Sequence, residues 1–168
     1  MAYECRRVVT GHTPEGKSTV LYDSMMALLE EDSAGAGARQ EDRAGAASRV
    51  IWTTQGFPAD NDDSSDAALC KVNTSESDGT VFRIVEYAPG VAPRHHRTNS
   101  IDYAAVLSGS IEIELDNVTV QLAAGDLLVQ RGTIHNWVNS GTESCVIAFI
   151  LIGAHPAMIN GTPLPAEG

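Results

Sequence analysis

The side chains best suited to chemistry are two histidines and one carboxylate in the second half of the chain, His96, Asp102 and His135. When two imidazoles and a carboxylate converge, they can hold a divalent metal and leave open positions, an arrangement that suits iron and accepts zinc or manganese. The same groups can also move protons without a metal, because imidazole titrates near neutral pH. If the fold brings them together, these three residues are candidates for metal binding and for acid–base catalysis.

A purely structural role for these residues also stays open. In that case His96 and His135 are hydrogen-bonded pocket residues, and Asp102 holds one of them in its tautomer. His95 precedes His96, and adjacent residues of a strand point to opposite faces, so an inward His96 predicts an outward His95. Only a β-bulge would turn His95 inward as a further ligand.

Other residues near these positions are candidates for a substrate pocket: Thr98, Tyr103 and Trp137. The two aromatic rings would form core or pocket wall, or would stack on a substrate. Arg94 and Arg97 flank the histidine pair, and either could orient an anionic carboxylate. Exposure at the surface is nevertheless the default expectation for an arginine.

Closely spaced β-strands must position these residues. After Gly79 the chain alternates short apolar runs with turns, which is typical of a β-sandwich or small barrel. The clearest hairpin alternates apolar residues from Ile111 to Leu122 around a turn at Asp116–Asn117. Because barrel strands point alternate residues inward, residues from distant segments can meet in one pocket. The expected strands are 81–88, 103–107, 110–115, 118–122, 127–130 and 145–152.

The rest of the chain is expected to pack on this core as part of one structural domain, which suits 168 residues that are 43% hydrophobic. Within residues 1–78 we predict two extended pieces around a turn, a short helix, a loop and a strand. The tail is expected to hold an ordered arm and a frayed end. The predicted ranges are 11–16 for the turn, 25–31 for the helix, 32–48 for the loop, 48–54 for the strand and 155–168 for the tail.

The charge balance restricts the classes of partner. The chain holds 22 Asp and Glu against 11 Lys and Arg, a formal net charge of -11. Nucleic acids and anionic membrane surfaces are bound by basic faces, so we expect neither as a partner. The first residues lack the apolar run of a signal peptide, and the apolar stretch 145–153 is about half of what a transmembrane helix needs. A cytoplasmic location is the expectation.

One segment resembles the first cupin motif, Gly-x5-His-x-His-x3-4-Glu-x6-Gly. Gly90, His96, Thr98, Asp102 and Gly109 stand at its spacings. Thr98 replaces the second histidine of the motif, and Asp102 replaces its glutamate. These two departures leave His96 and Asp102 as the ligands that this motif would supply.

A second segment resembles the second cupin motif, Gly-x5-Pro-x-Gly-x2-His-x3-Asn. It runs from Gly125 through Gly132 to His135 and Asn139, with the proline absent and the stretch before the histidine one residue shorter. The runs HRTNSIDYAAVLSG and GDLLVQRGTIHNW further resemble small single-domain cupins of microbes and fungi, many of which belong to natural-product pathways.

The resemblance implies an all-β fold, the cupin double-stranded β-helix or jelly-roll barrel, with its core at 79–154 and an N-terminal strand extension. It implies a tailoring enzyme of secondary metabolism that acts on a small organic acid or a polyketide-like molecule. The expected reaction is of lyase type, a dehydration or decarboxylation next to a carbonyl, by His/Asp acid–base or metal-assisted chemistry with Fe, Mn or Zn. An Fe(II)-dependent oxygenase or oxidoreductase and a non-enzymatic ligand-binding cupin are the alternatives.

The resemblance also implies a homodimer. In related cupins the N-terminal strands, here expected around Val8 and Val20, often pair across a dimer.

Overall fold

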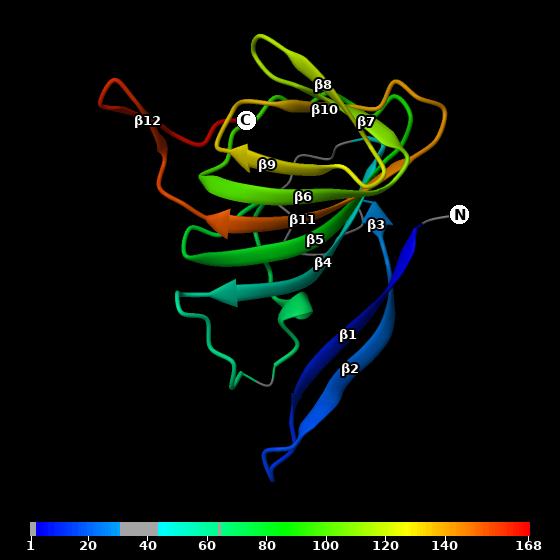
Figure 1. The fold of residues 1–168 in the computed structure, drawn as a ribbon, viewed down its shortest axis with the longest axis vertical. Coiled ribbons are helices and arrows are strands. Elements are labelled where there is room, and N and C mark those ends of the chain that lie inside the picture. The colour runs from blue at the N-terminus through cyan, green and yellow to red at the C-terminus, as the bar shows by residue number, and fades with distance from the viewer. Residues whose placement is uncertain (1–2, 31–43, 64) are drawn as a thin grey trace.

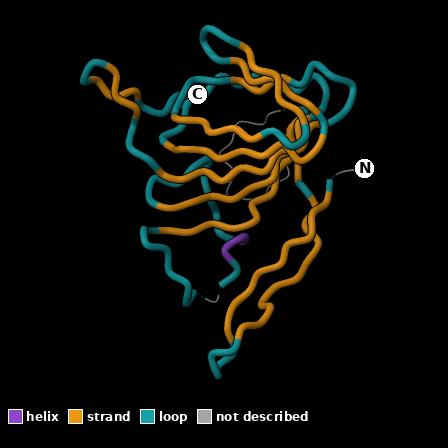
Figure 2. The backbone as a smooth tube through the Cα atoms, viewed as in Figure 1, coloured by secondary structure: helices purple, strands orange, loops and turns teal. Residues whose placement is uncertain are grey.

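The computed structural model describes residues 3–30, 44–63 and 65–168, and it consists mainly of β-strands (Figure 1). Within these ranges the only helical piece is a 3-10 turn, Ala67–Leu69 (Figure 2). None of the described residues belongs to a helix long and apolar enough to cross a membrane. The strands are β1 (Glu4–His12), β2 (Ser18–Ala27), β3 (Leu29–Glu30), β4 (Ala46–Gln55), β5 (Gly79–Tyr87), β6 (Ser100–Ser108), β7 (Ser110–Glu114), β8 (Thr119–Ala123), β9 (Leu127–Arg131), β10 (Asn136–Val138), β11 (Cys145–Gly153), β12 (Ala157–Ile159) and β13 (Thr162–Leu164).

Two sheets enclose the core. The larger sheet has the strand order β3-β4-β5-β11-β6-β9, and the smaller has the order β10-β7-β8. Ile147 and Phe149 of the larger sheet share one buried cluster with Ile111, Ile113 and Trp137 of the smaller. The all-β jelly-roll fold is thereby confirmed, and the predicted strands between 81 and 152 are all present.

Strand β11 is a continuous run of apolar residues because both of its faces are buried. Ile147 and Phe149 face the main core, whereas Val146 on the opposite face packs with Leu28 and Ile51 in a second cluster. A strand buried on both faces reads as a continuous apolar run. The N-terminal segment therefore covers part of the outer face of the larger sheet.

The predicted hairpin around Asp116–Asn117 is confirmed. Ile111 pairs with Leu122 and Ile113 with Val120, and the backbone N–H of Leu115 donates to Val118 at 2.9 Å. Both isoleucines are buried at 2% exposure, which matches the alternation of apolar and polar residues.

The predicted helix at 25–31 is wrong. Met25–Ala27 ends β2 and Leu29–Glu30 forms β3, while the last residue of the range lies outside the described residues. Met26 and Leu28 are buried while Met25 is 60% exposed, so burial alternates with a period of two rather than the 3.6 of a helix. Most of the predicted loop at 32–48 also lies outside the described residues, and β4 already begins at Ala46.

The two ends of the chain are held differently. Strands β1 and β2 form their own two-stranded sheet, which extends away from the barrel (Figure 1). After the β12–β13 hairpin the chain returns to the barrel, where Glu167 and Arg97 exchange backbone hydrogen bonds of 2.8 and 3.0 Å. The prediction of a frayed end is therefore wrong at Glu167, because the backbone of this residue is hydrogen-bonded to Arg97.

Candidate active site

The site is organised around His96 and His135, which lie opposite each other in a short antiparallel bridge. The backbone N–H of each donates to the carbonyl of the other at 3.0 Å. Their ring centroids lie 4.2 Å apart, and the side chains are buried at 8% and 3% exposure. The two motifs therefore converge as the sequence predicts, because their histidines face each other across the bridge.

Backbone carbonyls set which nitrogen each ring presents. Nδ1 of His96 lies 3.2 Å from the carbonyl oxygen of Arg94, and Nδ1 of His135 lies 3.0 Å from that of Thr133. A carbonyl oxygen can only accept, so each Nδ1 donates its proton there. In the neutral rings Nε2 then carries the lone pair, the state that a base or a metal ligand requires.

Asp102 reaches the histidines through other side chains. Its Oδ1 accepts from Ser100 Oγ at 2.5 Å, and its Oδ2 lies 3.4 Å from Nε2 of Gln130. The same Gln130 nitrogen lies 3.1 Å from Nδ1 and 3.3 Å from Nε2 of His135. Because Nδ1 donates to Thr133, the Gln130 amide can donate only to Nε2 of His135. Burial raises the pKa of Asp102 to about 6, while the Ser100 hydrogen bond and the charge of Arg83 lower it.

The donor set for a metal is only partly assembled. Two imidazoles anchored to carbonyls are suitable ligands, but the carboxylate of Asp102 faces Ser100 and Gln130. Among the described residues, no three His, Cys, Asp or Glu side chains lie where they could hold an ion together. The three-ligand face does not fit a metal in this arrangement, so metal binding stays a prediction and no chemical step is derived from it.

The histidines line a cavity of about 60 Å³, which residues of both sheets surround and which is partly open to solvent. Thr98 and Trp137 line it, as predicted for the substrate pocket. Tyr103 does not: it is 48% exposed and pairs with Val129 on β9, so its predicted place in the pocket is wrong. Its neighbour Asp102 points inward, which turns Tyr103 to the outer face. The wall consists of Thr74, Arg83, Val85, Tyr87, Arg94, His96, Thr98, Asp102, Gln130, His135, Trp137, Phe149 and Leu151.

Three polar residues of this wall were missed or misplaced by the sequence analysis: Arg83, Arg94 and Gln130. Arg83 shares strand parity with the buried Val81 and Val85, so the alternation along β5 carried a signal for it. Arg94 was expected at the surface, but it lines the cavity two residues before His96. Gln130 enters because β9 places it opposite Asp102.

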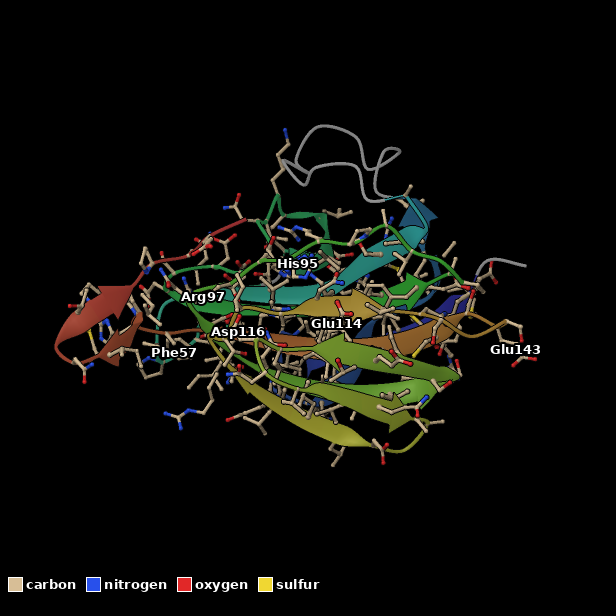
Figure 3. All side chains as sticks on the ribbon, turned by 90° about the horizontal axis from the view of Figure 1, so that it is seen from above. Phe57, His95, Arg97, Glu114, Asp116 and Glu143 are labelled. Atoms are coloured by element: carbon tan, nitrogen blue, oxygen red, sulfur yellow. The ribbon has the colours of Figure 1, made fainter. Side chains whose placement is uncertain are left out.

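The remaining residues near the pair lie outside this wall. His95 points outward as expected, with its side chain 64% exposed and its Nε2 3.8 Å from Oε2 of Glu114 (Figure 3). Arg97 donates from its guanidinium to Glu167 at 2.6 Å and to the carbonyl of Pro165 at 3.0 Å. Neither side chain lines the cavity.

Comparison with known proteins identifies the family. Residues 83–152 match Cupin_2, described as a cupin domain. The cupin-domain-containing oxidoreductase fogC of Aspergillus ruber is 31% identical over 163 residues, which are 92% of this chain and 75% of that protein. Oryzines biosynthesis cluster protein J of Aspergillus oryzae is 40% identical over 88 residues, 51% of this chain and 49% of that protein.

A further relative and a solved structure complete the comparison. Phomopsin biosynthesis cluster protein D of Diaporthe leptostromiformis is 45% identical over 85 residues, 49% of this chain and 45% of that protein. Both cluster proteins are thus matched over about half of their length. A putative ethanolamine utilization protein Q from Salmonella typhimurium has the same fold, with a TM-score of 0.50 and 13% identity over 90% of this chain and 98% of that one. The chain therefore belongs to the cupin family, together with relatives that include fungal oxidoreductases and biosynthesis-cluster proteins.

Proposed function

We propose that this cupin is a small-molecule tailoring enzyme of secondary metabolism that acts as a lyase on a carbon next to a carbonyl. The observation that supports it best is the buried pair His96–His135, whose rings lie 4.2 Å apart. Each ring is oriented by a backbone carbonyl at its Nδ1. Two imidazoles at one cavity can act as base and acid in a single turnover, because the imidazole group ordinarily changes charge near neutral pH.

For a dehydration the steps balance without an oxidant. Nε2 of one neutral imidazole takes the proton from the carbon beside the carbonyl, and the electron pair forms the new carbon–carbon double bond. The hydroxyl on the next carbon leaves with a proton from the other imidazole, which starts as imidazolium, and becomes water. For a decarboxylation, the pair from the broken carbon–carbon bond goes to the enolate, and the imidazolium then protonates its carbon. Trp137 and Phe149 make part of the wall apolar.

An oxidoreductase is the second candidate, and it is favoured by relatives such as fogC, which is named an oxidoreductase. This reaction needs an electron acceptor. The cupin motifs suggest Fe(II) and dioxygen, and iron would require Asp102 to turn from Ser100 towards the histidines. Iron dependence therefore separates the two candidates.

The test compares proton transfer with and without chelator. A panel of small 3-hydroxy and 3-oxo acids is incubated with the protein in D₂O and EDTA, and mass spectrometry follows deuterium uptake and loss of water or carbon dioxide. We expect turnover in EDTA, and a loss of about 10²- to 10⁴-fold in His96→Gln and His135→Gln. His95→Gln is the matched control, because this neighbouring histidine lies outside the cavity wall.

Each result leads to one interpretation. Chelator-resistant turnover that both variants lose supports the lyase. Turnover only with added Fe(II) and dioxygen overturns it in favour of the oxidoreductase. No turnover under either condition favours a ligand-binding cupin.

A further inference from the structure

We propose that the cavity binds a substrate carboxylate between the guanidinium groups of Arg83 and Arg94, so that the substrate is a small organic acid or the acid end of a larger molecule. This inference rests on the proposed function in one respect, that the reaction takes place at His96 and His135. The carboxylate site itself is argued from the two arginines of the cavity wall.

Arg94 offers a buried donor to the cavity. Its Nε is shielded from solvent and has no hydrogen-bond partner among the described residues. Its backbone is fixed, because the N–H of Arg94 donates to Oδ1 of Asn136 at 2.8 Å. An unsatisfied buried N–H is costly, whereas one that meets a carboxylate oxygen forms a strong, charge-assisted hydrogen bond.

Arg83 adds a second positive charge to the cavity wall. It lies on β5 of the larger sheet, is 8% exposed, and donates from one NH2 group to the carbonyl of Asn73 at 2.7 Å. The segment of Arg94, in contrast, is joined through Asn136 to β10 of the smaller sheet. A ligand in the cavity therefore lies between guanidinium groups that come from both sheets.

The charge of the wall differs from that of the whole protein. The chain carries a net charge of -11, but the wall contains two arginines against one carboxylate, Asp102. A bound anion would meet a positive, poorly solvated environment, in which charge–charge attraction is stronger than in water.

Size and position narrow the ligand class. A cavity of about 60 Å³ holds only a few atoms beside the histidine pair, so the rest of a larger ligand would lie towards the open side of the cavity. Arg94 lies two residues from His96, and its carbonyl oxygen is the one that orients this ring at 3.2 Å. Arg94, His96 and His135 all line this cavity, so a carboxylate held by Arg94 would share the cavity with the histidine pair.

The experiment measures equilibrium binding, which does not depend on turnover. Crotonate and its uncharged, nearly isosteric amide, crotonamide, are titrated into the full chain, and NMR follows the shifts of the histidine ring signals. We expect crotonate to bind about tenfold or more tightly than crotonamide, and Arg94→Gln to remove this difference. Arg131→Gln removes the same charge from an exposed position of β9 and is the matched control. Sodium chloride at equal ionic strength corrects for general salt effects.

The outcomes separate this proposal from the lyase proposal. Preference for crotonate that Arg94→Gln loses and Arg131→Gln keeps supports the carboxylate site, even if no acid is turned over. Equal binding of acid and amide, or a preference that survives in a folded Arg94→Gln, overturns it, even if turnover is found. Arg94→Lys, which keeps the charge, is expected to retain part of the preference, and a thermal melt of each variant confirms that it is folded.

Discussion

His96 and His135 are joined twice, by reciprocal backbone hydrogen bonds of 3.0 Å and by rings whose centroids lie 4.2 Å apart at an interplanar angle of 48°. The bridge fixes the two backbones, so the distance between the rings does not depend on long flexible side chains. Such preorganisation is what acid–base catalysis and metal binding both require.

The first prediction concerns Thr98, which stands where the cupin motif has its second histidine. Its side chain lines the cavity, and its Oγ1 lies 2.8 Å from Oγ of Ser100. Thr98→His should add a third imidazole and tighten binding of Zn or Mn by about tenfold or more. Competition with a chromophoric chelator measures the affinity, and Thr98→Val is the control. Unchanged affinity would mean that residue 98 does not face the ion.

The metal content of the wild-type chain is measured separately. Plasma mass spectrometry on protein purified without a metal column should find any bound Fe, Mn or Zn reduced in the His96→Ala, His135→Ala double variant. Equal content in both proteins would place the metal elsewhere.

The second prediction is that Asp102→Asn stabilises the metal-free protein at alkaline pH. Because burial raises the pKa of Asp102 to about 6, above its unfolded value near 4, the group favours folding at low pH, and this contribution is lost as the pH rises from about 4 to 6. Relative to the wild type, the variant should therefore gain up to about 3 kcal/mol between pH 4 and pH 8. Urea unfolding at the two pH values measures this. Exposed Asp116→Asn is the control, and a pH-independent effect of Asp102→Asn would contradict the prediction.

The third prediction concerns Arg7 and Asp66, which attach the β1–β2 sheet to the segment before the 3-10 turn. Their side chains are 5% and 17% exposed, and two hydrogen bonds of 2.6 and 2.7 Å join them. Asp66→Asn should lower the free energy of unfolding by about 2 kcal/mol at pH 7, because it leaves a buried guanidinium without its counter-charge. Arg6→Gln breaks the exposed pair with Asp23 and should change stability little.

The pH dependence of this pair has a definite sign. The Arg7 hydrogen bonds hold the pKa of Asp66 below its usual range, so the stabilisation is present above the unfolded pKa near 4. It is lost as the pH falls through the folded value. If the Asp66→Asn variant loses as much stability in acid as the wild type does, other carboxylates dominate the acid dependence of stability.

The fourth prediction is the homodimer. The β1–β2 sheet exposes apolar side chains, with Val8 at 48%, Val20 at 52% and Met25 at 60%. Exposed apolar surface of this kind is often covered by a partner. Light scattering should therefore give about twice the chain mass of 17.8 kDa, and Val20→Asp should shift the protein towards one chain. A single-chain mass for the wild type at every accessible concentration would refute the dimer.

The sequence by itself determined the family, the positions of the barrel strands along the chain and the convergence of the histidines. These follow from local signals, because alternation along a strand and fixed motif spacings depend on residues close in the chain. The hairpin at Ile111–Leu122, the inward Thr98 and the outward His95 are of this kind.

Only the tertiary structure decided which face of each strand is buried and which residues that face packs against. Alternation shows that Asp102 and Tyr103 point in opposite directions, but not which of them meets the core. The register that places Gln130 opposite Asp102 turns the carboxylate away from a metal-binding arrangement. The facing of the larger sheet likewise brings Arg83 into the cavity. Cross-strand register and sheet stacking join residues far apart in the chain, so the polar environment of the histidine pair arises only when the sheets close on each other.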